Sequence, residues 1–462
     1  DTSLAFSESV DDRFRSYGWN VLRVDDVNDL PALRGALKAA GEEASRPSLV
    51  IVESRIAFGA PTKEGKETAH GAPLGAAEVQ ATKENLGWPL EPTFLVPDEV
   101  RALFARRRAE VQKEYRAWRE TFSAWEAANP ALAAERDAAM AKRLPDDLEE
   151  QLLAALPGKA NATRRLSGDV IQKIHALVPY MVGGSADLSP STSTWIKGAA
   201  EIAKGAFEGH NFHFGVREHA MGSILNGISL YGGFIPFGAT FLVFADYMRP
   251  PIRLANIMGV QVVYVFTHDS IFVGEDGPTH EPVEQIASLR LIPGMKVLRP
   301  ADGPEVAAAW AYALRRQDGP TALILTRQGV PDIAREVPFS VEAFNRGAYV
   351  VAETAGRAPD VVIANAGISA GTVTGVAGDR AVFRRIVEVN LLAMPDTFAP
   401  FIAPMRAAGQ GTLVGIASVA GVRGIPGSEA YSASKAGVIA FLESLRVGLR
   451  AYRAALERGV LL

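Results

Sequence analysis

The segment Thr267–Pro282 holds the densest set of chemically capable side chains in this sequence. It combines two histidines with several acids and two glycines, a mixture that can hold polar ligands and exchange protons. The segment follows the apolar run Val260–Phe266, which is typical of a buried strand. Open α/β sheets bind ligands where their parallel strands end. We therefore predict a ligand site in this segment.

Other candidate groups are ambiguous on spacing alone. The motif Arg217–Met221 contains Glu218, yet a lone glutamate is most often a surface charge. Three aromatic residues, Phe241, Phe244 and Tyr247, recur at a helical spacing that favours a core stripe. These patterns therefore assign no role by themselves.

Tyr431 and Lys435, near the end of the sequence, are four residues apart, so on a helix they share one face. An ammonium beside a phenol favours the phenolate, which suits acid–base chemistry on an alcohol carbon. A bare pair of this kind is common on helices, and it carries weight only with further residues at matching positions.

The elements that must position these groups alternate between strands and helices. Strands are predicted at 19–24, 48–56, 180–183, 260–266, 295–298, 321–326, 360–364 and 411–418. Helices are predicted at 30–44, 97–129, 303–316, 380–394 and 431–450. The length of 462 residues accommodates roughly three domains of ordinary size. We divide the sequence into an α/β remnant (1–95), a helical linker (96–160), a second α/β domain (161–335) and a hybrid C-terminal α/β unit (336–462).

Composition narrows the function classes. Hydrophobic residues make up 48% and charged residues 22%, as in soluble globular proteins. The net charge of −4 gives no sign of a nucleic-acid partner, and we find no apolar stretch long enough to cross a membrane. The absence of cysteine excludes disulfides and thiolate chemistry and fits a reducing, cytoplasmic compartment. Because the sequence opens at Asp1 without a methionine, we expect a truncated or processed beginning.

Taken together, the motifs over residues 1–356 resemble transketolase. The resemblance implies a transferase that moves a two-carbon ketol unit from a ketose phosphate to an aldose phosphate, with thiamine diphosphate and Mg²⁺. It also implies a cytoplasmic homodimer of the pentose phosphate pathway. The implied fold is a series of parallel-sheet α/β modules of the thiamine-diphosphate-binding type, with a helical linker and a Rossmann-like C-terminal segment.

The resemblance assigns roles residue by residue. Glu218 matches the glutamate that activates the cofactor, and Phe241, Phe244 and Tyr247 match the aromatic wall around its pyrimidine ring. His70, Asp276 and His280 match residues that face the substrate. The residues that match the sugar-phosphate clamp are Arg164, Ser191, His268 and Arg327.

One part of the family pattern is absent from this sequence. Transketolases hold the metal and the diphosphate with a Gly-Asp-Gly motif and a later asparagine, and no such pair occurs here. No metal ligands are therefore assigned. We expect the chain to form a homodimer, or to need a partner chain that carries the missing N-terminal half of the diphosphate-binding domain.

Residues 360–450 resemble a different family, the short-chain dehydrogenases. The motif Asn365–Gly367 follows a predicted strand, and the residues that match the family tetrad are Asn390, Ser418, Tyr431 and Lys435. Nothing before Asp360 supplies a glycine-rich turn between a strand and a helix, so NAD(P) binding is not expected.

Three hypotheses remain. The first, a transketolase-like enzyme incomplete in this chain, is favoured because its motifs cover most of the sequence. The alternatives are an NAD(P)-dependent short-chain dehydrogenase and an inactive fused α/β hybrid. The change of family is placed near residues 354–360.

Overall fold

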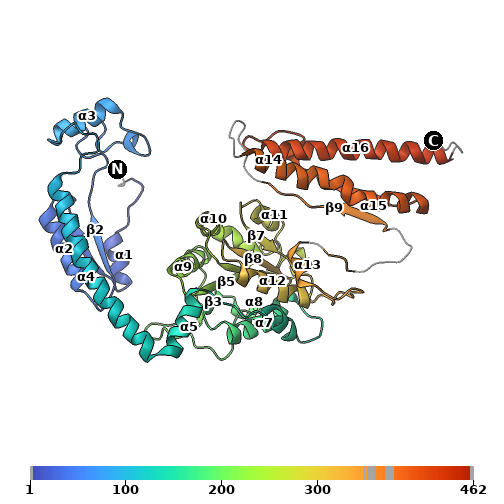
Figure 1. The fold of residues 1–462 in the computed structure, drawn as a ribbon, viewed down its shortest axis with the longest axis horizontal. Coiled ribbons are helices and arrows are strands. Elements are labelled where there is room, and N and C mark those ends of the chain that lie inside the picture. The colour runs from blue at the N-terminus through green and yellow to red at the C-terminus, as the bar shows by residue number, and fades with distance from the viewer. Residues whose placement is uncertain (1–3, 348, 352–358, 370–378, 458–462) are drawn as a thin grey trace. The chain divides into compact units, whose positions relative to one another are not determined.

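A computed structural model describes residues 4–347, 349–351, 359–369 and 379–457 of the chain (Figure 1). The chain forms two compact units, residues 1–127 and 128–462. The predicted change of family at 354–360 lies largely outside the described residues. The domain boundaries drawn from the sequence remain predictions.

The first unit contains a small parallel sheet. Its elements are α1 (Val10–Ser16), β1 (Asn20–Val24), α2 (Leu30–Glu42), β2 (Ser48–Val52), η1 (Glu67–Ala69), α3 (Ala76–Asn85) and most of α4 (Asp98–Ala128). Strands β1 and β2 pair in parallel, with Val21 opposite Leu49. Helix α2 begins after Asp29, whose side chain accepts a hydrogen bond from the amide of Ala32. Elements β1, α2, β2 and α4 agree with the sequence prediction, although β2 ends four residues early, and η1 and α3 were not predicted.

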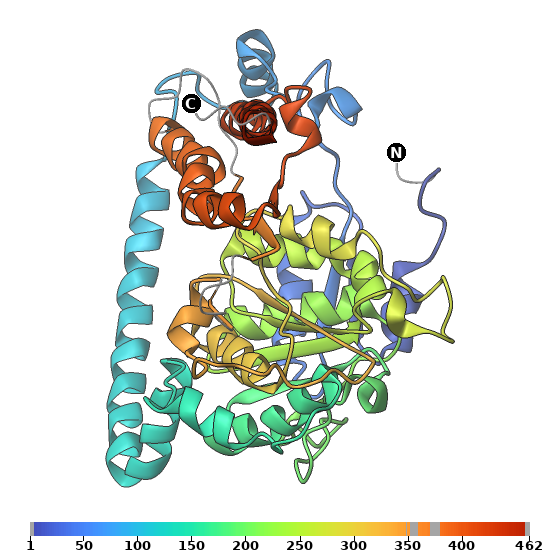
Figure 2. The same ribbon diagram turned by 90° about the vertical axis from the view of Figure 1, so that its right-hand side faces the viewer.

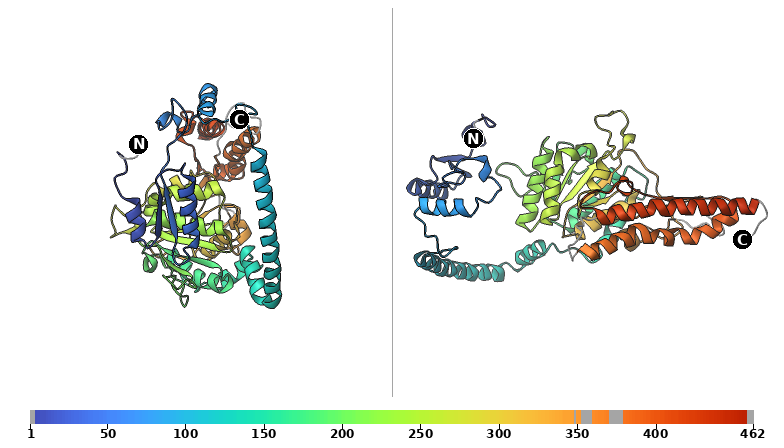
Figure 3. Two further views of the ribbon diagram at one scale, coloured as in Figure 1. Left: turned by 90° about the vertical axis from the view of Figure 1, so that its left-hand side faces the viewer. Right: turned by 90° about the horizontal axis from the view of Figure 1, so that it is seen from above.

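Helix α4 is a single long helix that buries no side chain (Figure 3). Its aromatic residues form a ladder in which Trp118 stacks between Tyr115 and Phe122, at 5.8 and 5.0 Å between ring centroids. Trp118 is 53% exposed. An exposed aromatic row of this length is unusual on a solvated helix.

The second unit is built on a six-stranded parallel sheet. Its strands are β3 (Met181–Ser185), β4 (Asn211–His213), β5 (Ile235–Phe241), β6 (Val263–Thr267), β7 (Lys296–Leu298) and β8 (Thr321–Leu325). They lie in the order β4-β3-β5-β6-β8-β7, and every pairing is parallel. The parallel α/β fold class predicted from the sequence is confirmed.

Helices cover both faces of this sheet (Figures 1 and 2). Alternate residues of β6 divide between two cores: Val263 and Val265 join one cluster, Tyr264 and Phe266 the other. The first cluster includes α6 (Leu148–Ala154), α7 (Thr163–Leu177) and α12 (Gly303–Arg315); the second includes α9 (Glu218–Tyr231), α10 (Arg249–Met258) and α11 (Gln285–Arg290). The remaining elements of this part are α5 (Pro130–Met140), α8 (Ser189–Thr192), η2 (Leu242–Met248), η3 (Ile271–Val273) and α13 (Val341–Asn345).

Two strands were missed by the sequence prediction. Strand β4 is only three residues long, and the central strand β5 contains Pro236 and Gly238, both disfavoured in strands. Gly238 is needed there, because a β-carbon at this position would lie 2.4 Å from the Leu225 side chain of α9. The close packing of α9 on β5 therefore explains why this strand contains a glycine that local composition would disfavour.

A buried ion pair fixes the end of this α/β domain. Arg335 donates two hydrogen bonds to the carboxylate of Asp302, at 2.5 and 2.9 Å, and Asp302 is fully buried at the start of α12. The hydroxyl of Tyr349 accepts from Arg335 at 2.9 Å and donates to Glu305 at 2.7 Å. The segment that ends at Tyr349 is thereby held against α12.

The C-terminal segment has a second, two-stranded parallel sheet. Its elements are β9 (Val361–Ala364), α14 (Asp379–Val387), the π-helical turn η4 (Glu388–Leu392), α15 (Ala393–Ala408), β10 (Thr412–Gly415), η5 (Val419–Gly421) and α16 (Glu429–Glu457). Helices α14 and α16 pack side by side (Figure 3). The helical stretch predicted to end at Met394 continues to Ala408.

One sequence-based statement needs correction. The helical stretch 379–408 is long and apolar enough to meet the criteria for a membrane-crossing helix, with a mean hydropathy of 1.3. Pro400 and Pro404 interrupt its hydrogen bonding, and Met394 and Phe398 are buried in the core of this segment. These contacts favour a packed helix of a folded domain.

Candidate active site

The candidate residues of the transketolase-like part that lie in the second unit gather at one edge of the six-stranded sheet. Because all its strands run in parallel, their carboxyl ends meet there: Phe241 closes β5, His268 follows β6, and Arg327 lies just beyond β8. Phe241 is paired with Thr267, and Thr267 with Leu325. This is the edge at which α/β sheets form ligand sites.

Glu218 is the first residue of α9, and its carboxylate is buried. The hydroxyl of Thr240 in β5 donates to Glu218 Oε1 at 3.4 Å. The positive end of the helix dipole favours a carboxylate at this position. A buried carboxylate with a weak partner is well suited to accept a hydrogen bond from a ligand. The burial of Glu218 also argues against its interpretation as a surface charge.

The three aromatic residues form a wall whose exposure to solvent increases from Phe241 to Tyr247. Phe241 is buried at the end of β5, and Phe244 and Tyr247 lie on η2, so the three do not share a regular α-helical stripe. The Phe241 and Phe244 rings are nearly parallel at 5.7 Å, and Tyr247 follows at 6.1 Å from Phe244, 64% exposed. The ring of His280 stands edge-on to Phe244 at 5.3 Å.

His268 is buried in a strained backbone conformation. Its φ of 60° lies in the left-handed region, which costs a non-glycine residue about 1 kcal/mol or more. Burial lowers the pKa of His268, and the charges of Arg164, Arg327 and His280 add to this effect, so that the pKa is about 3. The imidazole is therefore neutral at pH 7, and its Nε2 lies 3.9 Å from Asp276 Oδ2.

The guanidinium of Arg164 is only partly satisfied by the protein. Its Nη1 donates to the backbone carbonyl of Ser191, and its buried Nε has no hydrogen-bond partner within the described part of the chain. Burial lowers the pKa of Arg164, and the charges of Arg165 and Arg327 lower it further. Such a group is stabilised by an added negative charge, as a phosphate would provide.

His70 lies in the first unit, immediately after η1, with an exposed side chain. The other candidates of the transketolase-like part belong to the second unit. Since each unit is described by itself, the role of His70 stays a prediction.

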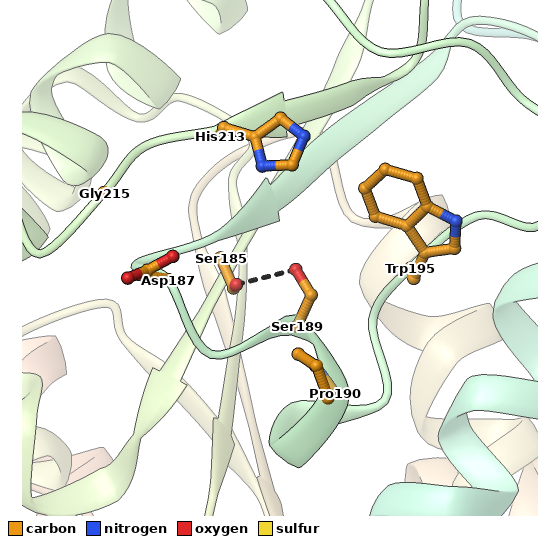
Figure 4. Close-up of a pocket in the computed structure, with 7 residues that line it drawn as sticks. All are labelled: Ser185, Asp187, Ser189, Pro190, Trp195, His213 and Gly215. Atoms are coloured by element: carbon orange, nitrogen blue, oxygen red, sulfur yellow. Dashed lines mark hydrogen bonds between the residues drawn. The ribbon is translucent and has the colours of Figure 1, made fainter.

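A cavity of about 290 Å³ opens beside the clamp at the ends of β3 and β4 (Figure 4). Trp195 and His213 lie on one side of it, 5.6 Å between ring centroids, and Ser185 and Ser189 are hydrogen-bonded at 2.9 Å on another. Asp187, which also lines the cavity, has a φ of 65°.

Sequence reasoning missed these residues. For Asp187 a signal existed, because an acid directly after the glycine-rich strand β3 falls at the functional edge of the sheet. Trp195 and His213 carried no such signal, since they meet only through the fold.

In the C-terminal segment, Asn390 and Lys435 converge on Gly367. A β-carbon on Gly367 would lie 3.2 Å from Lys435 Nζ and 3.5 Å from Asn390 Oδ1. Lys435 Nζ donates to the carbonyl of Ile416 at 2.8 Å and lies 5.9 Å from the centre of the Tyr431 ring. Burial lowers the pKa of Lys435.

The other tetrad residues make local contacts. Ser418 Oγ accepts from the amide of Ala420 at 3.2 Å, and Asn365 is exposed after β9. Asn390 is held by both backbone groups of Ile368, at 2.7 and 2.9 Å. The structure thus brings two of the four predicted tetrad residues, Asn390 and Lys435, to the same place beside Gly367.

Comparison with known proteins identifies the two parts. Residues 1–145 match the family described as transketolase, thiamine diphosphate binding domain, and residues 159–332 match transketolase, pyrimidine binding domain. Residues 1–332 belong to the transketolase family. Residues 340–456 match the short chain dehydrogenase family. Both resemblances drawn from the sequence are confirmed.

Individual transketolases show the same relationship. The enzyme of Geobacillus stearothermophilus is 47% identical over 400 residues, which are 86% of this chain and 59% of that protein. The enzyme of Bacillus subtilis is 42% identical over 397 residues, again 59% of its length. The chain thus spans less than two thirds of the relatives it matches.

Solved structures agree. Transketolase from Leishmania mexicana superimposes with a TM-score of 0.73 at 33% identity, covering 94% of this chain and 59% of that one. A complex of the Pichia stipitis transketolase with sedoheptulose 7-phosphate gives a TM-score of 0.72 at 35% identity, covering 90% and 58%.

The donor set fits one end of thiamine diphosphate. A buried carboxylate and an aromatic wall suit a flat aminopyrimidine, which stacks and donates hydrogen bonds. For the other end, no group of three metal-ligating side chains converges among the residues that the structure describes.

Proposed function

We propose that this chain carries the pyrimidine pocket and the substrate clamp of a transketolase. The reaction moves a two-carbon ketol unit: the bond between C2 and C3 of a ketose phosphate breaks, and a new bond forms to the aldehyde carbon of an aldose phosphate. The observation that carries the proposal is the grouping of Glu218, the aromatic wall and the two arginines at one edge of the sheet.

On this proposal, thiamine diphosphate supplies the electron sink that makes the carbon–carbon cleavage feasible. Glu218 accepts a hydrogen bond from the pyrimidine ring and thereby favours one protonation state of that ring. Phe241, Phe244 and Tyr247 enclose that ring and exclude water.

The substrate is held by the remaining residues. Arg164, Ser191, His268 and Arg327 bind the phosphate, and His70, Asp276 and His280 orient the hydroxyl groups near the reacting carbons. The forked donors of two guanidiniums suit a phosphate, and the unpartnered Nε of Arg164 supports this assignment.

The metal and diphosphate ligands are proposed to come from a chain segment that carries the Gly-Asp-Gly and asparagine motifs. Magnesium takes oxygen ligands and bridges to phosphate oxygens, so without it the diphosphate loses its main anchor. A homodimer is part of the proposal, because the aromatic row of α4 needs a cover. The proposal also places the protein in the cytoplasm and in the pentose phosphate pathway.

A complementation assay tests this proposal. The chain is assayed for ketol transfer with Mg²⁺ and thiamine diphosphate, alone and with a chain that carries the diphosphate-binding segment of a transketolase. We expect little turnover alone, since stacking and one hydrogen bond give only millimolar binding, and activity with the added chain. Glu218→Ala must abolish it, whereas Glu208→Ala must not. Turnover that survives Glu218→Ala would refute the cofactor assignment.

The dehydrogenase alternative is weaker. Lys435 and Asn390 meet at Gly367 as a dehydrogenase site requires, but no glycine-rich dinucleotide loop between a strand and a helix precedes Asp360. An inactive hybrid predicts that no added chain restores turnover, and the same assay tests that outcome.

A further inference from the structure

The guanidinium of Arg327 already has a carboxylate partner within this chain. Its Nη2 donates to Glu275 Oε1, and its Nε lies 3.6 Å from Asp276 Oδ2. Both acids belong to the loop that follows η3. One N–H group that would bind a phosphate is therefore already engaged by a carboxylate oxygen of the loop, and Nε faces a second carboxylate at 3.6 Å.

The two acids differ in how firmly they are held. Asp276 is partly buried and lies between Arg327 and His268, at 3.6 and 3.9 Å. Glu275 is 74% exposed, and its side chain makes no second contact with a side chain among the described residues. Of the two, Glu275 can leave Arg327 for water at little cost.

The surroundings favour an anion at this position. Arg164 and Arg327 are close enough for the charge of each to act on the other, while His268 is neutral and adds no charge. Glu275 places one negative oxygen at the outer side of this cationic pair. A phosphate offers three acceptor oxygens in the same geometry and can engage both arginines.

We propose that Glu275 is an internal anion that occupies Arg327 until a phosphorylated substrate displaces it, and thereby sets the affinity for the phosphate group. The inference rests on the proposed function in that it takes Arg327 as a phosphate ligand. Each binding event then exchanges one ion pair for another, and unphosphorylated sugars, which cannot displace the carboxylate, are disfavoured.

The size of the effect follows from the exposure of the pair. Exposed ion pairs contribute about 0.2–1 kcal/mol, so removing the competitor should tighten phosphate binding roughly two- to fivefold. The effect should shrink at high ionic strength, because salt screens exposed charges.

Calorimetric titration of the full chain with inorganic phosphate at low ionic strength tests the inference directly and needs no turnover. We expect Glu275→Gln to bind phosphate two- to fivefold more tightly than the parent chain. Glu284→Gln removes the same charge nine residues away and should leave the affinity unchanged. Arg327→Ala should weaken binding, and Glu275→Gln should give no gain in that background.

The outcomes separate the two proposals. If Arg327→Ala weakens binding but Glu275→Gln has no effect, the phosphate clamp stands and the role of Glu275 is wrong. An equal gain from Glu284→Gln would also overturn it, since net charge would then be the cause. If no variant binds phosphate, both the clamp and the competition are refuted.

Discussion

The ring of Phe241 stacks on the ring of His268 with 3.7 Å between their centroids. Phe241 ends strand β5, and His268 directly follows the adjacent strand β6. Phe241 belongs to the proposed cofactor wall and His268 to the proposed phosphate clamp, so this contact joins the two halves of the site. A change in either ring should therefore affect both.

The lowered pKa of His268 gives a pH-dependent stability. Its folded-state pKa is about 3, against an ordinary value of 6.5, so below pH 6.5 the unfolded chain takes up a proton that the folded chain refuses. Stability should fall as pH drops through 6.5, by up to about 1.4 kcal/mol per pH unit from this group. Urea denaturation from pH 7.5 to 4.5 should show a steeper loss for the parent chain than for His268→Gln. Equal slopes would contradict this account.

Substitution of Arg327 should act on substrate binding. In the complemented enzyme, Arg327→Ala removes a charge-assisted contact worth about 1.5–3 kcal/mol. The KM for a ketose phosphate should rise roughly ten- to hundredfold, with a smaller change in kcat. An unphosphorylated ketose is the control substrate, and its KM should not rise. A loss confined to kcat would place Arg327 elsewhere in the reaction.

The buried pair of Arg335 and Asp302 should be important for folding. Arg335→Met leaves an uncompensated buried carboxylate, which costs about 3–5 kcal/mol. The exposed pair of Arg346 and Glu342 is a matched control, and Arg346→Met should cost less than about 1 kcal/mol. Denaturation midpoints that shift equally for both variants would show that burial does not decide the outcome.

Nicotinamide cofactors should bind weakly or not at all. The segment that resembles a dehydrogenase presents Tyr431 and Lys435, but no glycine-rich turn before Asp360 is available to hold a pyrophosphate at a helix N-terminus. A fluorescence titration with NADH should reveal no micromolar affinity, and Tyr431→Phe should leave the curve unchanged. Saturable micromolar binding that depends on Lys435 would favour the dehydrogenase alternative.

The aromatic row of α4 should mediate self-association. Trp118→Ser removes the central ring of the ladder, and light scattering after size exclusion should show a dimer that dissociates at higher concentration than the parent. Phe207→Ser removes an exposed ring outside the row and serves as the control. A dimer of unchanged strength would exclude this surface.

The sequence predicted the elements whose local composition agrees with their environment. Helix α12 begins at Asp302, a good N-cap, and β6 is an unbroken apolar run, so both were found. Strand β5 was missed, because Pro236 and Gly238 are both disfavoured in strands and Gly238 is needed there for its close approach to α9. The positive φ of His268 and Asp187 is likewise imposed by the fold.

The rest of the site could not be predicted from the sequence, because it depends on contacts between residues that are far apart in the chain. The amide of Thr163 donates to the Thr326 hydroxyl at 2.9 Å, and this contact sets Arg164 and Arg327 on neighbouring segments. No local pattern predicts a contact between residues 163 positions apart. The residue types of the clamp were recognised by resemblance, and their meeting point came from the topology of the sheet.

The ion pair that ends the α/β domain makes a contact with the second family's part of the chain. The match to the transketolase pyrimidine binding domain ends at residue 332 and the match to the short chain dehydrogenase family begins at residue 340, so Arg335 lies between the two matches and Tyr349 lies within the second. The hydroxyl of Tyr349 nevertheless bonds to Arg335 and to Glu305 of α12. Removal of the chain from residue 340 onward would therefore take a hydrogen-bonding partner away from Glu305 and from the buried pair of Arg335 and Asp302.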